Sequence, residues 1–183
     1  MKPRPAGRYI ALLFCAFSLI TGGCKAVDDV INPSLPAETQ EGKNTFGCKV
    51  NDALWLPYTE HTIDRALEPE YDHGWFTLRA ERETGNLPYI NLQLADSTGL
   101  HTKHYSEAEG FGGSVTFYEN GQSDTYITLP GDRADITLTK AEPPAPNGSR
   151  EVIISGTFSF VATSTLSGKK VTVTEGRFDL KAR

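Results

Sequence analysis

The sequence contains no apolar run long enough to cross a membrane. Its longest run, Tyr9–Ile20, has twelve residues and is interrupted only by Ser18. A membrane-spanning helix needs about 20 apolar residues, so this run is too short to be one. A shorter apolar stretch close to the N-terminus is instead typical of the central region of a secretory signal peptide.

The residues on either side of this run predict a bacterial lipoprotein signal. Lys2, Arg4 and Arg8 supply positive charge before it, and Thr21-Gly22-Gly23 ends it directly before Cys24. Small residues at the cleavage point admit a signal peptidase, and a cysteine directly after them predicts cleavage before Cys24 and acylation of its sulfur. An ordinary secretory signal is the alternative, because threonine stands where the lipoprotein motif usually has leucine.

This signal divides the chain into three segments. We predict a signal peptide at 1–23, a lipidated N-terminus and flexible tether at 24–43, and a single domain at 44–183. Each buried methylene contributes about 0.8 kcal/mol, so two or more acyl chains on Cys24 form an effectively permanent membrane anchor. We expect the protein at the outer membrane. Asp28-Asp29 resembles the export signal of some Bacteroidetes surface lipoproteins, which favours display at the cell surface over the periplasmic face.

Cysteine and positive charge are both scarce in the mature chain. After cleavage only Cys24 and Cys48 remain, and acylation of the first excludes an internal disulfide. We predict that Cys48 is a small buried hydrophobe rather than a reactive thiol. Without the three basic residues of positions 1–23, which include no acid, 15 basic residues face 23 acidic ones, a net charge of −8. Such a surface repels phosphate, so no nucleic acid partner is expected.

From Asn44 onward, apolar residues recur with a period of two, which is typical of strands with one buried face. We therefore predict an all-β domain, either an antiparallel β-sandwich or a closed barrel, with about 8–10 short strands. Residues 62–70 are the only candidate for a helical turn, and Pro69 would end it. The clearest alternating stretches lie near 90–94, 115–118, 136–139, 154–163 and 171–180.

Turn residues separate these stretches. Asn120-Gly121 predicts a two-residue type I′ hairpin, and Asn51-Asp52 can also turn a hairpin because both residues tolerate the left-handed region better than most. Gly176, between two alternating stretches, indicates a bulge or sharp bend within one long strand. The prolines of residues 142–149 predict a loop.

Three segments carry a resemblance: Asn44–Pro57, NTFGCKVNDALWLP, then Ile154–Phe160, ISGTFSF, and Gly176–Leu180, GRFDL. They resemble a family of Bacteroidetes lipoproteins classed as a domain of unknown function. In such proteins glycine usually follows the Val-Asn pair, where this chain has Asp52. The resemblance extends over nearly the whole mature chain. It implies an exported lipoprotein with a β-rich domain, and it implies no activity.

Ionisable residues form no recognisable catalytic or metal-binding pattern, so we predict no catalytic residue, no metal site and no cofactor. One alternative is a hydrolase with a loop-built site near His73 and His101. Acidic pairs across a cleft and calcium in turns are weaker alternatives. The residues considered are His61, His73, His101, His104, Glu68, Glu70, Glu81, Glu83, Asp96, Asp132 and Asp135.

Aromatic residues are numerous, and those that point outward could stack on sugars or apolar ligands. We expect the phenylalanines and Trp55 to fill the core, and Tyr118 to face out because it alternates with Val115 and Phe117. The leading hypothesis is a non-enzymatic binding or structural accessory module whose partner is a carbohydrate, an apolar ligand or a protein. A lipocalin-like carrier is a further alternative. The aromatic residues considered are Trp55, Tyr58, Tyr71, Trp75, Tyr89, Tyr105, Phe111, Tyr118 and Tyr126.

Overall fold

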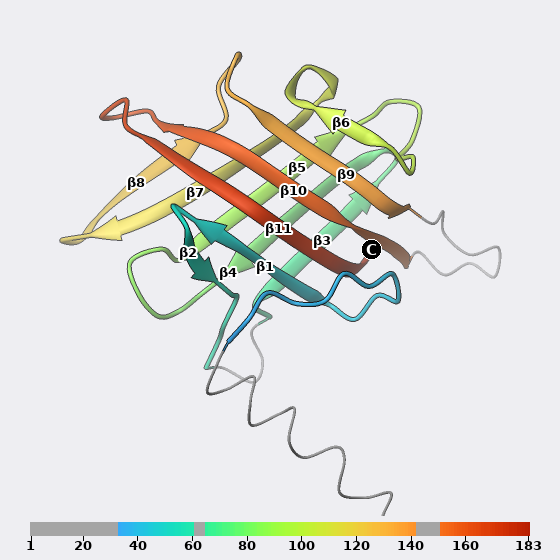
Figure 1. Ribbon diagram of the computed structural model, residues 1–183, viewed down its shortest axis with the longest axis horizontal. Coiled ribbons are helices and arrows are strands. Elements are labelled where there is room, and N and C mark those ends of the chain that lie inside the picture. Colours follow the sequence, from blue (N-terminus) through green and yellow to red (C-terminus); the bar gives the residue numbers. More distant parts are fainter. Residues whose placement is uncertain (1–32, 61–64, 142–150) are drawn as a thin grey trace, which may run out of the picture. The chain divides into compact units, whose positions relative to one another are not determined.

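The computed structural model describes residues 33–60, 65–141 and 151–183, and the folded unit begins at Leu35. Within these residues the chain forms eleven strands and one 3₁₀ turn, η1 (Glu107–Glu109) (Figure 1). The strands are β1 (Thr45–Val50), β2 (Ala53–Trp55), β3 (Leu67–Asp72), β4 (Trp75–Glu81), β5 (Tyr89–Ala95), β6 (His104–Ser106), β7 (Phe111–Glu119), β8 (Gln122–Ile127), β9 (Ala134–Ala141), β10 (Val152–Ser164) and β11 (Lys170–Ala182).

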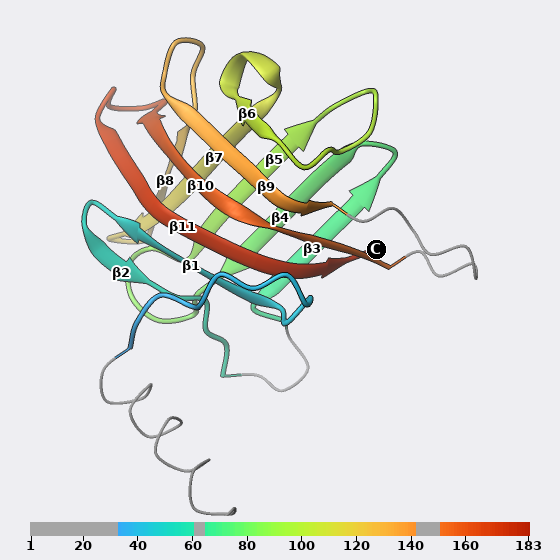
Figure 2. The same ribbon diagram turned by 45° about the vertical axis from the view of Figure 1, so that its right-hand side comes forward.

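All eleven strands belong to one antiparallel sheet. Its order is β2-β1-β11-β10-β8-β7-β5-β4-β3, while β9 pairs with β10 and β6. The long strand β10 joins two layers, because its first part pairs with β9 and only its last two residues pair with β8. The layer of β1, β9, β10 and β11 crosses over the layer of β3, β4, β5 and β7 (Figures 1 and 2).

The prediction of an all-β domain is confirmed, with one strand more than the expected range. The closed barrel, one of the two predicted architectures, is wrong because the sheet does not close on itself. Among the described strands, β3 at the far end of the order forms a ladder with β4 alone. A hydrogen bond from the Tyr71 N–H to the Arg183 carbonyl, 3.1 Å long, joins β3 to the last residue of the chain. The sheet stays open, and its two crossed layers pack around a shared core.

Three two-residue hairpin turns connect neighbouring strands. Asn51-Asp52, His73-Gly74 and Asn120-Gly121 have positive φ at both positions, as a type I′ turn requires. The hairpins predicted at Asn51-Asp52 and Asn120-Gly121 are confirmed. The helical turn suggested for 62–70 is wrong for residues 67–70, which lie in β3, and residues 61–64 lie outside the described part. Pro69 is tolerated there because β3 pairs with β4 on one side only.

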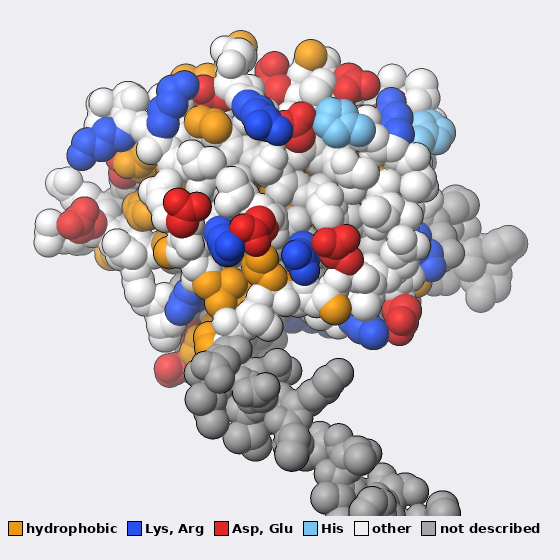
Figure 3. Space-filling model, in the orientation of Figure 1, with side chains coloured by type: hydrophobic (Ala, Val, Ile, Leu, Met, Phe, Trp, Pro, Cys, Tyr) orange, Lys and Arg blue, Asp and Glu red, His pale blue; other side chains and the backbone are white. Residues whose placement is uncertain are grey.

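The outer face of the β1, β9, β10 and β11 layer carries charges of both signs, mixed together (Figure 3). Several of them pair locally: Lys49 with Glu175 at 2.6 Å, and Arg133 with Asp135 at 2.8 Å. Exposed pairs of this kind contribute little to stability, with a median of about 0–1 kcal/mol. This face is therefore a solvated, charge-balanced surface.

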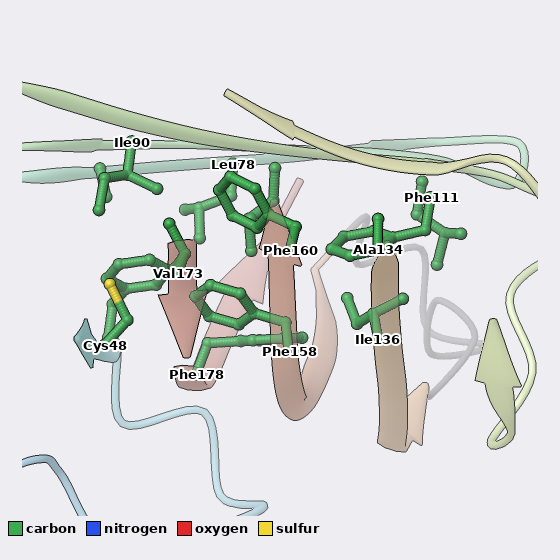
Figure 4. Packing of buried hydrophobic residues seen from close by; sticks show 14 of the residues in the cluster. Cys48, Leu78, Ile90, Phe111, Ala134, Ile136, Phe158, Phe160, Val173 and Phe178 are labelled. Carbon is green, nitrogen blue, oxygen red and sulfur yellow. The ribbon is translucent and has the colours of Figure 1, made fainter. Parts of the chain in front are cut away.

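Phenylalanine rings fill the space between the two layers (Figure 4). Phe178 of β11 stacks on Phe76 of β4, with ring centroids 5.9 Å apart, and so connects one layer to the other. In the β10–β11 ladder, Phe158 lies opposite Gly176 and Phe178 opposite Gly156. The bulge predicted at Gly176 is confirmed by a register shift next to it.

Residues 35–43, predicted as flexible tether, instead form part of the folded unit. The carboxylate of Asp179 on β11, which is 1% exposed, accepts hydrogen bonds from the Thr39 hydroxyl and from the N–H groups of Glu41, Gly42 and Lys43. A buried carboxylate requires such donors, and three successive N–H groups wrap around it. The boundary of the domain therefore moves from Asn44 to Leu35.

Candidate functional site

The outer face of β3, β4, β5, β7 and β8 contains a shallow, half-open hollow of about 580 Å³. We call it the polar hollow. Its volume lies within the usual range of about 300–1,000 Å³ for small-molecule sites. The residues that line it are Glu68, Glu70, Thr77, Leu78, Arg79, Asn91, Leu92, Gln93, Gly112, Gly113, Ser114, Ile127 and Thr128.

The period-two pattern of these strands places their polar residues in the hollow. Phe76, Leu78, Ile90 and Leu92 point into the core, so the residues between them point outward. The strand register then aligns the outward residues into rows that cross the sheet. One row is Glu70, Thr77, Gln93 and Gly112, and the next is Glu68, Arg79, Asn91, Ser114 and Ile127.

Two adjacent glycines on β7 have different roles. A Cβ on Gly113 would lie 2.5 Å from the ring of Phe160, so the core packing requires glycine there. A Cβ on Gly112 would meet nothing nearer than the Gln93 Cγ, at 3.9 Å. Glycine inside a strand weakens it and often marks a close approach by a ligand. Gly112 therefore keeps the hollow open. The strand loses stability by having glycine there, and no packing contact explains that loss.

Hydrogen bonds and stacking fix the polar groups of the hollow. The Asn91 amide donates to the Ser114 hydroxyl at 3.1 Å, which directs the amide oxygen away from that contact. The Arg79 guanidinium lies over the ring of Tyr89, 4.2 Å from its centroid, and within 3.9 Å of Glu68. The hollow thus presents hydroxyls, amides, carboxylates and one guanidinium in a preformed arrangement.

Exposed aromatic residues lie on the same face. Trp75 precedes Thr77 and Arg79 in the outward row of β4 and is 51% exposed. Tyr118, on the outward row of β7, is 54% exposed, as predicted. Trp55 is buried, also as predicted, and its indole N–H donates to the Leu87 carbonyl at 3.0 Å.

The three histidines in the described part of the chain form no common site. His73 occupies the β3–β4 turn, is almost fully exposed and contacts the adjacent Asp72. His101 lies 3.4 Å from the hydroxyl of Thr98, and His104 lies 3.1 Å from Asp135. His61 lies outside the described residues. Among the residues that the structure describes, no group of three or more His, Cys, Asp or Glu could hold a metal ion.

The aspartates considered for calcium have local partners instead. The hydroxyl and N–H of Thr98 both donate to Asp96 and lower the pKa of its carboxyl to about 2. The Lys170 ammonium, 2.5 Å from Asp132, lowers the pKa of that carboxyl. The neighbouring guanidinium of Arg133 does the same for Asp135. Glu83 accepts hydrogen bonds from the Thr59 hydroxyl and the Glu60 N–H, each 2.6 Å long.

Buried polar residues have structural roles. Cys48 is fully buried in the core, as predicted, and burial raises the pKa of its thiol, which keeps it protonated and unreactive. Tyr105 is buried as well, and burial raises the pKa of its phenol. Its hydroxyl accepts a hydrogen bond from the His101 N–H at 2.8 Å, which fixes the loop before β6.

Comparison of the chain with protein-family models, with curated proteins and with solved structures finds no match in any of the three. The resemblance to the Bacteroidetes lipoprotein family therefore stays a prediction. No helix within the described ranges is both long and apolar enough to span a membrane. Cys24, the predicted lipidation site, lies outside those ranges.

Proposed function

We propose that this protein is a non-enzymatic binding module, held at the outer membrane by acyl chains on Cys24, whose ligand-binding surface is the polar hollow. The observation that carries this proposal is Gly112. Its missing side chain leaves a polar space open where no packing contact requires glycine. A strand that loses stability to keep such a space open is typical of a functional site.

The arrangement of the loops supports binding over hydrolysis. The Thr98 hydroxyl, next to His101, already donates to Asp96 at 2.6 Å, so it is not set up as a nucleophile. His73 contacts Asp72 at the tip of a turn where the imidazole is 96% exposed to water, whereas a hydrolytic site needs its reacting groups shielded from water.

The packing of the core supports an open surface site over an enclosed one. A lipocalin-like carrier needs an apolar cavity between its strands. Here Phe46, Phe158 and Phe160 stack in sequence, with centroids 5.3 and 6.3 Å apart, in the space that such a cavity would occupy.

The anchor is tested by replacing Cys24 with serine and fractionating the cells. We expect the wild-type protein in the membrane fraction with acyl chains detected by mass spectrometry, and the Cys24→Ser variant outside it, because the anchor depends on those chains. Cys48→Ala is the matched control, since it removes a buried thiol and leaves the anchor intact. Equal membrane association of Cys24→Ser and the wild type would contradict the anchor.

The binding surface is tested by nuclear magnetic resonance on the mature chain carrying Cys24→Ser. Three classes of probe are titrated: oligosaccharides, peptides and fatty acids. A ligand of the hollow shifts the amide resonances of Thr77, Gln93 and Gly112 and leaves those of Thr157 and Thr172, on the opposite layer, unchanged. If no probe of any class perturbs the hollow, the proposed binding role is refuted.

A further inference from the structure

The chemistry of the polar hollow defines a class of ligand. Resting on the proposed function, we propose that the hollow binds a neutral oligosaccharide, with Trp75 as the stacking platform and the amides and hydroxyls beside it as hydrogen-bonding partners. Four observations carry this inference: the mixture of hydrogen-bond donors and acceptors, the exposed indole of Trp75, the open space at Gly112 and the charge of the residues that line the hollow.

Donors and acceptors are interleaved at short spacing across the hollow. Thr77 and Ser114 offer hydroxyls, Asn91 and Gln93 offer amides, and each of these four groups both donates and accepts. Neighbouring strands lie about 4.8 Å apart, and successive outward residues of one strand about 6.7 Å apart. A sugar chain has the complementary surface, because each of its hydroxyls also donates and accepts.

Trp75 supplies the apolar part of the site. It pairs with Ala95 on β5 and with Asp72 on β3, and its side chain is 51% exposed, so the indole is open to a ligand. The C–H groups on one face of a sugar ring stack on such an aromatic surface. With one ring on Trp75, the next sugar units reach the row of Thr77 and Gln93 and then the row of Arg79.

Gly112 leaves room for an oligosaccharide beside Thr77 and Gln93. It lies beside Gln93 in the first row after Trp75, and a side chain there would project into the hollow. The guanidinium of Arg79, held over Tyr89, is a fixed donor in the following row.

The charge and shape of the face argue against other ligands. Two carboxylates, Glu68 and Glu70, line the hollow beside a single lining cation, Arg79, so phosphate, sulfate and uronate groups are disfavoured. Extended peptides add to the free edge of a sheet, whereas the hollow lies on the face of a sheet whose central strands are paired on both sides. Fatty acids need an enclosed apolar cavity, whereas the hollow is half open and eight of its thirteen lining residues are polar or charged.

The experiment measures binding of a panel of tetrasaccharides by calorimetry and by amide shifts, using the Cys24→Ser mature chain. The neutral probes are cellotetraose, xylotetraose, mannotetraose, maltotetraose and chitotetraose, and tetragalacturonate is the acidic probe. We expect at least one neutral probe to bind at the hollow, and tetragalacturonate to bind more weakly than that probe.

Gly112→Val is the decisive variant. The space at the Cβ of residue 112 is open, so we expect the variant to keep its fold. The added side chain should block the space that the oligosaccharide occupies and weaken its binding more than tenfold. Thr116→Val is the matched control, because it places the same side chain on the same face of β7, outside the hollow. We expect its affinity to stay within twofold of the wild type.

Trp75→Ala tests the stacking platform independently. Loss of one stacked aromatic residue is expected to weaken binding by about tenfold. Tyr58→Ala is its control: Tyr58 is 48% exposed, similar to the 51% of Trp75, but it does not lie on the strands of the hollow. Thermal unfolding of all four variants establishes that each is folded.

The possible outcomes separate this inference from the proposed function. Peptide or fatty-acid binding that Gly112→Val abolishes, with no binding of any tetrasaccharide, would refute the oligosaccharide inference and retain the binding role. Oligosaccharide binding insensitive to both Gly112→Val and Trp75→Ala would place the site elsewhere and overturn both. If none of the tetrasaccharides binds, the inference is wrong.

Discussion

Replacing Asp179 with asparagine tests how residues 39–43 are held on the domain. In the wild type, one carboxylate oxygen accepts from the Gly42 N–H at 2.7 Å and from the Ser155 hydroxyl at 2.7 Å. The other accepts from the Thr39 hydroxyl at 2.5 Å and from the N–H groups of Glu41 and Lys43. All of these donors face a single charge that is 1% exposed.

Asparagine keeps the shape of Asp179 and replaces one acceptor oxygen with a donor. If its oxygen retains Thr39, Glu41 and Lys43, the amide nitrogen faces Gly42, whose N–H then has no acceptor. The Ser155 hydroxyl can rotate and accept. One buried donor without a partner costs about 1–3 kcal/mol, and the remaining bonds lose the benefit of the charge. We therefore expect a loss of about 3 kcal/mol in the free energy of unfolding at pH 7.

The same carboxylate makes stability depend on pH. Burial alone raises the pKa of Asp179, but the hydrogen bonds from Thr39, Ser155, Gly42 and Lys43 outweigh it and hold the pKa far below its ordinary value. The resulting stabilisation is complete above the unfolded pKa of about 3.9 and is lost as the pH falls through the folded value. At pH 3 the gap between wild type and Asp179→Asn should therefore shrink by about 1 kcal/mol.

Urea unfolding of both proteins, followed by the fluorescence of buried Trp55, measures these differences. Glu38→Gln is the control on the same segment. Its exposed ion pair with Arg177, 3.4 Å long, should change the free energy of unfolding by no more than about 0.5 kcal/mol. An Asp179→Asn variant as stable as the wild type at pH 7, with the same dependence on pH, would refute this reasoning.

Three shorter predictions concern the core and the turns. Gly176→Ala should lower the free energy of unfolding by about 1–3 kcal/mol in urea titration, because its Cβ would lie 2.5 Å from the Phe158 ring; equal stability would contradict the close packing. Gly121→Ala should lower it by about 1 kcal/mol through its positive φ of 78°, since nothing lies within 4 Å of the added methyl. The Cys48 thiol should resist Ellman's reagent in the folded protein and react fully in urea.

Much of the fold could be predicted because the signals were local. Period-two alternation identified the strands, and Asn120-Gly121 identified a type I′ turn, since both depend only on neighbours in sequence. The choice between sandwich and barrel depends on pairing at a distance. It is decided where Thr163 and Ser164 of β10 pair with β8 instead of β9, and no pattern in the sequence marks that change of partner.

The predicted end of the tether was wrong because the contact that folds residues 35–43 is distant in sequence. Residues 35–43 are polar and contain Pro36, as linkers do. What folds them is the carboxylate of Asp179, more than 130 positions further along the chain. A buried aspartate in a strand looks in sequence like any outward polar residue, so its role could not be predicted.

The candidate site was missed for a related reason. Outward residues of a strand alternate in the same way whether they face solvent or a ligand, so Asn91 and Gln93 gave no separate signal. Gly112-Gly113 was a visible pair, but sequence could not tell that Phe160 requires one glycine and nothing requires the other. The distinction depends on what lies across the core from each residue.

Docking of residues 35–43 also changes how far an anchored domain can stand from the membrane. A tether of 24–43 would span at most about 66 Å, whereas 24–34 spans at most about 36 Å, at about 3.3 Å per residue. If Cys24 carries the anchor, the bonds around Asp179 therefore fix the reach of the polar hollow. Asp179→Asn should release up to nine residues, and faster hydrogen exchange at Glu41, Gly42 and Lys43 is the measurement that detects it. Unchanged exchange there would mean that contacts other than this carboxylate hold the segment.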